Sequence, residues 1–316
     1  MARHELVICT RNRASDVAQC LDRVNACTVV PDRVIVVDSS DTDETQRTVE
    51  MQATDGRNRL RTRYVRADPG LTHQRNVGLA ELTENCEIVH FIDDDSRVSE
   101  RYFDEILRGF AASSTAVGVG GYILPLGAPP RVGARGRIGE RYRRIFLLRP
   151  RPGRVSRSGR NALYRVPPDD LTRVEWLSGC AMSFVAPLAK QLRFDESLGG
   201  YGLGEDMEFS SRMAKFGPLI LNPQATLQHL VSPANRLQIE DMFHRDVVNR
   251  YYFHKKRPED FGLFAFGWSL LGMAGEASLG LFGSSRPESF AEFRGLTCGV
   301  QELAARRFRA QSGARF

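Results

Sequence analysis

The sequence predicts an α/β fold, with a doubly wound, mostly parallel sheet, helices on both faces and a helical C-terminal extension. Three observations predict it. Short β-branched runs alternate with stretches of helical apolar spacing, these runs end in polar or acidic residues, and the chain beyond Leu237 has a helical pattern. With 316 residues, 42% of them hydrophobic, the chain can bury one large core with additions or two modest domains.

Strands and helices are predicted to alternate at the start of the chain. The predicted strands are residues 5–9 (ELVIC), 33–38 (RVIVVD) and 87–92 (EIVHFI). Helices are predicted over residues 14–24, where Ser15 is a plausible cap, from Asp43 onward, and over 71–82. Ligands of such sheets bind beyond the carboxyl ends of the strands. We therefore expect residues 10–13, 38–41 and 93–95 to line one crevice.

The middle of the chain interrupts this pattern. Residues 125–170 are rich in proline, glycine and arginine, which predicts an insertion or a flexible flap. Order is expected to return at residues 174–184, followed by a glycine-rich stretch and a helix from about Glu205 to Lys215. The predicted organisation is an α/β domain over residues 1–235, with an arginine-rich insertion at about 126–170, and a helical extension over residues 236–316.

The net charge of +6 has a local origin. Residues 131–160 contain eleven arginines, no lysine and one acidic residue, Glu140, so this segment carries +10 and the rest of the chain about −4. Such a segment is typical of contact with a phosphate-bearing partner, a lipid headgroup or nucleic acid. A solvated mobile loop held open by charge repulsion explains it equally well.

The cysteines and the N-terminus indicate a cytoplasmic protein. The six cysteines form no CxxC pair and several lie in apolar runs, which predicts reduced core residues. The opening MARHELVICT lacks the basic start, apolar stretch and cleavage site of a secretory signal.

Three adjacent aspartates at a predicted strand end are the strongest local signal for chemistry. Carboxylates such as those of Asp93, Asp94 and Asp95 suit hard divalent cations, Mg²⁺ or Mn²⁺, which in turn bridge a diphosphate. The alternative is an acidic turn that only caps the next helix. Asp38 is less specific, because a carboxylate after a second strand either accepts from a nucleoside or begins a turn. A Rossmann dehydrogenase shares that acid, but the first turn here reads TRNRA, without the three glycines of GxGxxG.

Taken in series, the blocks TRN, VIVVDSSDTDET, GLTHQRNVGLAEL and VHFIDDDSRVS resemble the nucleotide-binding half of family 2 glycosyltransferases with a GT-A fold. LSGCAMSFVAPL and FDESLGGYGLGEDMEFSSRMAKFG resemble the second half. The resemblance covers residues 5–125 and 175–233. It implies that the α/β domain is a GT-A catalytic domain, and that a hexosyl-type transfer from a nucleotide-diphosphate sugar inverts the anomeric centre. Cell-envelope polysaccharide, glycolipid or natural-product glycoside synthesis would be the setting.

Carried over residue by residue, the resemblance implies these roles. Thr10 and Asp38 contact the nucleoside, Arg75 faces the diphosphate, and Asp93 and Asp95 form the DxD pair, with Asp95 the principal metal ligand. Arg11 and Asn12 in the TRN block, and Asp94 in the aspartate triplet, are also expected to bind the nucleotide-sugar donor. Two departures stand out: Arg11 replaces an aromatic that often flanks the base, and Ala181 replaces an asparagine common on the acceptor side.

The acceptor side is expected around Glu205 and Asp206. The resemblance places the catalytic base at Asp206, and a positioned carboxylate suits deprotonation of a hydroxyl. A helix N-terminus would lower the pKa of these carboxylates, and Glu205 would alternatively hold an acceptor hydroxyl. His229 resembles the metal-binding histidine of some relatives, although a lone histidine is often structural. Trp176 is compatible with a sugar-stacking platform or with core packing.

The C-terminal extension combines NRYYFHKKR with the apolar residues 261–282. This pattern indicates either peripheral attachment to an anionic membrane at the inner face of the cell membrane, with a lipid-linked acceptor, or helices packing on one another. Two other classes compete. A nucleic-acid-binding protein is indicated only by the arginine segment and is not expected. A non-catalytic GT-A-like binding protein would not require both the DDD triplet at residues 93–95 and the GED triplet at residues 204–206.

Overall fold

The computed structural model describes residues 2–54, 56–126, 134–230, 232, 237–281 and 286–311. The chain forms two compact units, one made of residues 1–129 and 163–236 and the other of residues 130–162 and 237–316. Each unit is described by itself.

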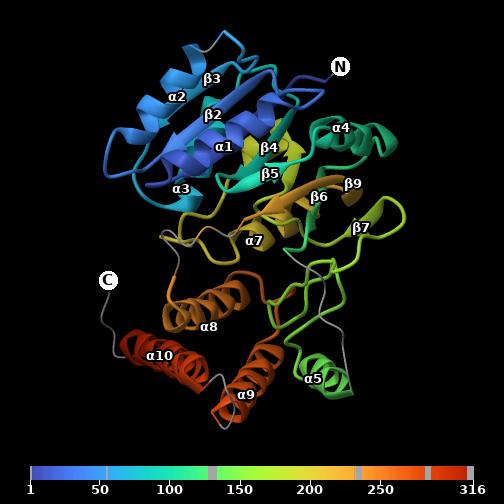
Figure 1. The fold of residues 1–316 in the computed structure, drawn as a ribbon. Coiled ribbons are helices and arrows are strands. Elements are labelled where there is room, and N and C mark those ends of the chain that lie inside the picture. Colours follow the sequence, from blue (N-terminus) through green and yellow to red (C-terminus); the bar gives the residue numbers. More distant parts are fainter. Residues whose placement is uncertain are drawn as a thin grey trace. The chain divides into compact units, whose positions relative to one another are not determined.

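The first unit is built on one nine-stranded, mixed sheet (Figure 1). Its strands follow the order β3-β2-β1-β4-β8-β6-β9-β5, and β7 pairs with β9. The strands are β1 His4–Thr10, β2 Arg33–Asp38, β3 Thr62–Arg66, β4 Ile88–Asp93, β5 Ser96–Val98, β6 Gly118–Leu124, β7 Thr172–Val174, β8 Met182–Val185 and β9 Leu219–His229. The four neighbouring strands β3, β2, β1 and β4 are parallel, which confirms the doubly wound α/β fold.

Helices cover both faces of the sheet. Alternate side chains of β1 and β2 point to opposite faces, so Leu6 and Val34 pack with α1 and α4, and Val7 and Ile35 pack with α3 and α7. Figure 1 shows α1 and α2 lying across β1–β3. The helices of this unit are α1 Ala14–Asn25, α2 Glu44–Thr54, α3 Leu71–Glu81, α4 Tyr102–Ala112, α6 Ala186–Leu192 and α7 Glu205–Met213.

The predicted helices before the acidic triplet are present, with one local difference. The residue that caps α1 is Arg13, not Ser15, and no side chain makes the capping hydrogen bond. His229 is the last residue of the eleven-residue strand β9. Its pairing with β6 shifts register between Gly121 and Tyr122, which leaves Pro223 outside the regular ladder.

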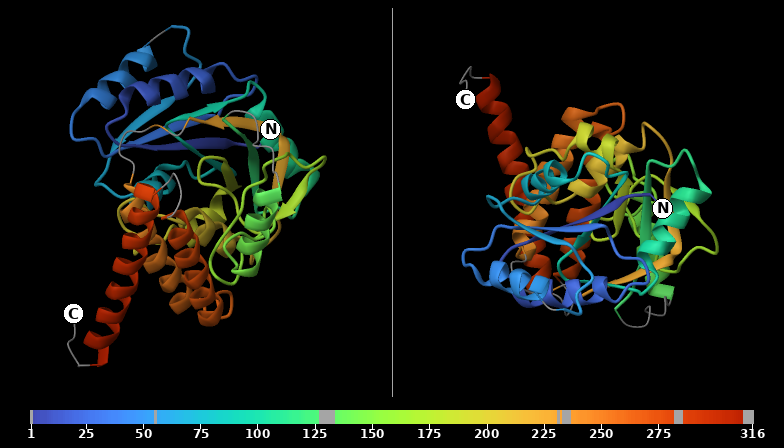
Figure 2. Two further views of the ribbon diagram at one scale, coloured as in Figure 1. Left: turned by 60° about the horizontal axis from the view of Figure 1, so that its bottom comes forward. Right: turned by 90° about the horizontal axis from the view of Figure 1, so that it is seen from above.

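The second unit contains four helices, α5 Ala134–Ile145, α8 Ile239–Lys256, α9 Leu263–Gly280 and α10 Arg286–Gln311. The arginine-rich segment was expected as an insertion in the α/β domain, but residues 130–162 cluster with the C-terminal helices instead, and part of the segment is helical. Figure 2 shows α10 as a long straight helix in red. No helix among the described residues combines the length and apolarity needed to cross a membrane.

A buried histidine pair in the first unit makes stability depend on pH. His4 Nδ1 lies 2.9 Å from His90 Nε2, and His90 Nδ1 lies 2.8 Å from Ser183 Oγ. Burial lowers the pKa of both histidines; for His4, nearby Asp32 partly opposes this. Below about pH 6.5 the two histidines therefore bind more protons in the unfolded chain than in the folded protein. The stability that the neutral, buried pair provides is present above that pH and is lost as the pH falls.

We expect the free energy of unfolding to fall between about pH 7 and pH 5, by ~1.4 kcal/mol per pH unit for each proton bound on unfolding. His90→Gln keeps polar atoms at this position and removes one titrating group, so its stability should change less steeply with pH. Urea unfolding at several pH values measures this. His73→Gln, at an exposed position, is the control. Equal slopes in His90→Gln and the unsubstituted protein would contradict the prediction.

Candidate functional site

The carboxyl ends of three adjacent strands bring the predicted residues together. Thr10 on β1 lies beside Asp38 on β2, and Cys9 on β1 lies beside Asp93 on β4. Because parallel strands end at the same edge, the loops that follow them surround one region. The expected grouping of residues 10–13, 38–41 and 93–95 is therefore confirmed.

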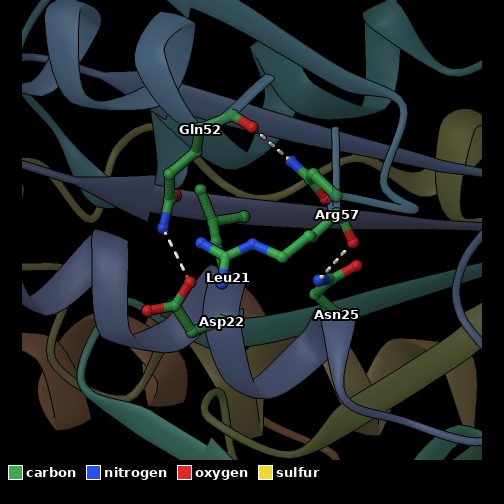
Figure 3. A pocket seen from close by; sticks show the side chains of 6 residues that line it. Leu21, Asp22, Asn25, Gln52 and Arg57 are labelled. Atoms are coloured by element: carbon green, nitrogen blue, oxygen red, sulfur yellow. Dashed lines mark hydrogen bonds between the residues drawn. The ribbon is translucent and has the colours of Figure 1, made fainter. Parts of the chain in front are cut away.

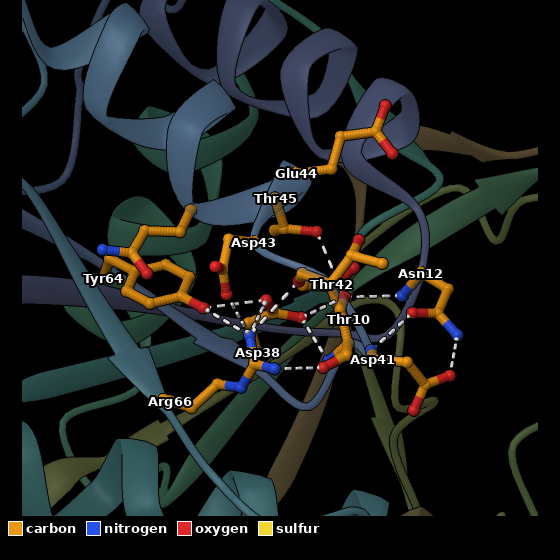
Figure 4. A network of polar contacts seen from close by, with 12 residues as sticks. Thr10, Asn12, Asp38, Asp41, Thr42, Asp43, Glu44, Thr45, Tyr64 and Arg66 are labelled. Carbon is orange, nitrogen blue, oxygen red and sulfur yellow. Dashed lines mark hydrogen bonds and ion pairs between the residues drawn. The ribbon is translucent and has the colours of Figure 1, made fainter.

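On the β2 side, Asp38 is the centre of a polar network (Figure 4). Its side chain is fully buried; Oδ1 accepts from the Ser40 amide at 2.8 Å and Oδ2 accepts from the Tyr64 hydroxyl at 2.9 Å. Arg66 lies 3.6 Å from Asp38 Oδ2 and also donates to the Ser40 carbonyl. Tyr64 and Arg66 were not predicted, because their short strand β3 has no run of apolar residues that would identify it.

Arg11 and Asn12 tie the loop after β1 to the loop after β2. Asn12 has a left-handed backbone (φ 55°), donates to Asp41 Oδ2 at 2.7 Å and accepts from the Asp41 amide at 2.8 Å. Arg11 pairs with Asp41 at 3.2 Å, and its side chain stays 46% exposed. Arg11, Asn12 and Asp41 are all exposed, so this contact between the two loops is accessible to a ligand.

The three aspartates of the triplet have different partners. Asp94 accepts from Thr10 Oγ1 at 2.7 Å and from Arg13 at 2.9 Å. Burial raises the pKa of Asp94 to about 6, although Arg13 and Thr10 oppose the shift. Asp93 and Asp95 face His229 instead. The alternation expected for a DxD pair is thus present in the geometry, with Asp94 directed to β1.

Strand pairing delivers His229 to the aspartates. The short strand β5 folds back after the triplet and pairs antiparallel with β9, which places Ser96 opposite His229. His229 Nε2 then lies 3.0 Å from Asp95 Oδ1 and 3.5 Å from Asp93 Oδ2. The Ser232 amide donates to the other Asp95 oxygen at 2.8 Å.

This cluster has the donors that a divalent cation requires. Asp95 Oδ1 is buried and faces His229 Nε2 at 3.0 Å. Two carboxylates and an imidazole fit Mn²⁺ or Mg²⁺. One donor atom from each of Asp93, Cys180 and His229 also lies within 4.8 Å of the others. Cys180 was predicted only as a core residue, and no CxxC or CxxH spacing identifies it as a ligand.

Arg75 connects the triplet to the start of α7. Its guanidinium forms an ion pair with Glu205, lies 3.5 Å from Asp93 and donates to the Gly179 carbonyl at 3.3 Å. A Cβ at position 179 would lie 2.7 Å from Arg75 Nη2, so a larger residue there would displace the guanidinium. The sequence-based assignment had Arg75 facing a diphosphate, but in the structure it is 2% exposed and its charge is directed at two carboxylates.

Glu205 and Asp206 begin α7, after a left-handed Gly204 (φ 83°). Asp206 Oδ2 accepts from the Gly179 amide at 3.0 Å, and Oδ1 accepts from the Met207 amide at 2.7 Å. Glu205 is buried, whereas Asp206 is partly exposed. The helix N-terminus was expected to lower both pKa values, and this is wrong: burial raises the pKa of Glu205 to about 8, against the effect of Arg75, and also raises the pKa of Asp206.

Two other features lie outside this cluster. Trp176 was considered as a platform for a sugar ring, but it is 6% exposed and packed in the core, so its ring offers no open face. A hollow of about 340 Å³ is lined by residues of α1 and the α2–β3 connection (Figure 3). Its residues Asn25 and Asn58 lie near the amino ends of the strands, opposite the acidic triplet, and it contains none of the predicted site residues.

The nine-stranded mixed sheet with helices on both faces is a GT-A fold, shared with the solved structures described below. The chain matches the profile of Glycosyl transferase family 2 over residues 5–171, and it belongs to that family. No protein among curated sequences matches it significantly.

Solved structures share the fold at low sequence identity. A mannosyltransferase from Pyrobaculum calidifontis, PcManGT in complex with GDP-Man and Mn²⁺, has a TM-score of 0.59 and 18% identity over 95% of this chain and 87% of its own. GalNAc-T7 with UDP, GalNAc and Mn²⁺ has a TM-score of 0.57 and 15% identity over 98% of this chain and 57% of its own. TarS from S. aureus has a TM-score of 0.53 and 14% identity over 90% of this chain and 44% of its own.

Proposed function

We propose that the protein transfers a hexosyl group from a nucleotide-diphosphate sugar to a hydroxyl acceptor, with inversion and with a divalent cation. The observation that carries this proposal is the buried bridge made by Arg75. It links Asp93, at the end of β4, to Glu205, next to Asp206 at the start of α7. Donor-side and acceptor-side carboxylates therefore belong to one network, as transfer between two bound substrates requires.

The donor nucleoside is assigned to the ends of β1 and β2. Thr10 and Asp38 face this region, and the exposed Arg11 and neighbouring Asn12 provide donors beside it. The Asp38 carboxylate is fixed by Ser40 and Tyr64, which orients it for a ribose hydroxyl or a base N–H. The relatives were solved with GDP-Man and with UDP, and UDP-, GDP- and dTDP-sugars are all candidates here.

Asp93, Asp95 and His229 would hold the cation, Mn²⁺ or Mg²⁺. When bound, the cation supplies positive charge that stabilises the departing diphosphate. The chain's own contribution is the rigidity of the donors, because β5–β9 pairing positions His229 and the Ser232 amide orients Asp95. Arg75 holds Asp93 from the other side.

Asp206 is the proposed base. Its carboxylate is fixed by two backbone amides and is partly exposed, so it is oriented and accessible to an acceptor hydroxyl. Glu205 is buried against Arg75, which assigns it to holding the network rather than to the acceptor hydroxyl. Asp206 takes the hydroxyl proton as the oxygen attacks the anomeric carbon opposite the leaving group, and a single displacement inverts the configuration.

A thermal-shift panel with UDP-, GDP-, dTDP- and CDP-sugars tests the donor class. A ligand present at ~100 times its dissociation constant adds ~2.7 kcal/mol to the free energy of unfolding. We expect one nucleotide class to raise the melting temperature, more so with Mn²⁺ than without it. The proposal fails if no nucleotide sugar stabilises the protein or is hydrolysed. If nucleic acid then binds in a salt-dependent way, the protein is a nucleic-acid-binding protein instead.

We further propose that the second unit binds an anionic membrane through α9 and α5. The outward face of α9 is apolar: Leu263, Phe264, Leu271 and Leu279 are 47%, 84%, 62% and 70% exposed. Trp268 stacks between Phe264 and Phe146, with ring centroids 6.4 and 4.8 Å away. Aromatic and aliphatic side chains in this arrangement suit a lipid interface.

Charge on α5 selects an anionic membrane as the partner. Tyr142 of α5 donates to the Gly272 carbonyl of α9, so the two helices pack together. Exposed arginines 141, 143 and 144 and exposed Ile145 therefore flank the apolar face. Within NRYYFHKKR, which was expected to contact the membrane, Arg250, Phe253 and Arg257 are buried, whereas Lys255 and Lys256 are exposed. A membrane-bound enzyme would suit a lipid-linked acceptor.

We expect the protein to float with vesicles that contain anionic lipid at low salt and to dissociate at high salt, since each basic residue near such a surface contributes ~1 kcal/mol. The double variant Phe264→Ser, Leu271→Ser should lose most of this binding. Phe216→Ser, which removes an exposed phenylalanine from the first unit, is the matched control and should float normally. Absence of flotation of the unsubstituted protein at low salt would leave α9 as a packing helix.

A further inference from the structure

Cys180 lies among the donors assigned to the cation. Its thiol is 3% exposed, and its donor atom, one oxygen of Asp93 and one nitrogen of His229 all lie within 4.8 Å of one another. Ser178 Oγ also lies 3.6 Å from Cys180 Sγ. The site therefore contains a soft donor beside two hard carboxylates and an imidazole.

The backbone explains why the thiol lies there. Gly179, one residue earlier, uses its amide for Asp206 and its carbonyl for Arg75. Cys180 follows in the turn that leads into β8, whose partner β4 ends at Asp93. Gly179 therefore contacts the proposed base and the arginine, and the next residue, Cys180, lies among the proposed cation donors.

Donor chemistry separates two kinds of cation at this site. Mn²⁺ and Mg²⁺ prefer oxygen donors and retain water or substrate oxygens, whereas Zn²⁺ and Cd²⁺ prefer thiolates. Asp93, His229 and Cys180 supply the carboxylate, imidazole and thiol donors that zinc sites use, and Asp95 Oδ1 lies 3.0 Å from His229 Nε2.

We propose that Cys180 is a further ligand beside Asp93 and His229, engaged by thiolate-preferring divalent ions and not by Mn²⁺ or Mg²⁺, so that Zn²⁺ displaces the activating ion. The inference rests on the proposed cation site. When the ion binds, the thiol releases its proton to solvent and a sulfur–metal bond forms, with no change of oxidation state. Zinc would therefore inhibit the enzyme by replacing the activating ion.

Cobalt spectroscopy tests the ligand directly, without an activity assay. Co²⁺ substitutes for Zn²⁺, and a cysteine ligand produces a sulfur-to-cobalt charge-transfer band in the near ultraviolet. The parent protein should carry Cys298→Ser, because Cys298 is exposed and would otherwise bind the ion separately. We expect the band in this parent at one equivalent of Co²⁺, with bleaching on addition of Zn²⁺.

Cys180→Ser and Cys180→Ala should lose the band and weaken Zn²⁺ binding at least about tenfold. Mn²⁺ affinity, measured by electron paramagnetic resonance, should stay unchanged in both. Cys20→Ser is the matched control, because Cys20 is also buried but its thiol donates to the Asp93 main-chain carbonyl and Cys20 is not grouped with the cation donors. It should keep the band.

The outcomes separate this inference from the proposed function. If the parent binds Co²⁺ without a charge-transfer band, or the Cys180 variants keep the band, Cys180 is not a ligand although the cation site stands. If the parent shows the band but binds no Mn²⁺, the cysteine assignment holds and the proposed activating cation fails. Because the first test uses the parent alone, it decides the question even if a Cys180 variant does not fold.

Discussion

Replacing Asp206 by asparagine should lower kcat by roughly 10²–10⁴-fold, the usual contribution of general base catalysis. The substitution preserves shape and removes proton acceptance from the partly exposed carboxylate at the start of α7. Donor affinity should stay near that of the unsubstituted protein, since Asp206 does not contact the donor-side residues. Steady-state kinetics with the donor identified by thermal shift, together with donor titration, measure both quantities.

Glu205→Gln is the informative comparison. Glu205 neutralises the buried Arg75, so its loss should lower the melting temperature more than the loss of Asp206 does. A larger fall in the saturated rate for Glu205→Gln than for Asp206→Asn, with both proteins folded, would move the base to Glu205. The anomeric proton signal of the product, compared with that of the donor, checks the stereochemistry, and a retained configuration would rule out the single displacement.

Removing the cation or its principal ligand should have a comparably large effect. Chelation should abolish turnover, and Mn²⁺ or Mg²⁺ should restore it. Asp95→Ala removes the buried carboxylate that faces His229, and it should lower turnover by at least ~10²-fold. The gain in donor affinity that Mn²⁺ provides should also disappear.

Asp94→Asn is the matched control for Asp95→Ala. Asp94 is the adjacent residue, but its carboxylate pairs with Thr10 and Arg13 and does not face His229. Its Mn²⁺ affinity, measured by electron paramagnetic resonance, should therefore remain close to that of the unsubstituted protein. Full activity in excess chelator, or equal loss of Mn²⁺ affinity in both variants, would contradict the assignment of Asp95 as the principal ligand.

The parallel half of the fold was predictable because its signals are local. The runs RVIVVD and EIVHFI have the β-branched composition of buried strands, and a doubly wound sheet then fixes which loops meet. The shared edge of Thr10, Asp38 and Asp93 follows from these two facts alone. Strand β3 was missed because TRYVR mixes charged and apolar residues.

Long-range contacts account for what the sequence did not predict. Arg75 matched a family block, yet its partner Glu205 and the carbonyl of Gly179 lie more than a hundred residues away, and their burial is a property of the folded chain. The pKa values of Glu205 and Asp206 were misjudged for the same reason: a helix N-terminus is visible in the sequence, whereas desolvation is not. Cys180 and residues 130–162 acquire their neighbours only through tertiary packing.

The pairing of Ser96 with His229 has a consequence for how the protein is made. The acidic triplet leaves the ribosome early, but the imidazole that completes the cluster belongs to β9, near the end of the first unit. A nascent chain that ends before β9 carries the carboxylates without the histidine, and no single local element contains all the ligands. If Asp93, Asp95 and His229 hold the cation as proposed, tight cation binding requires that β9 has already paired with β5.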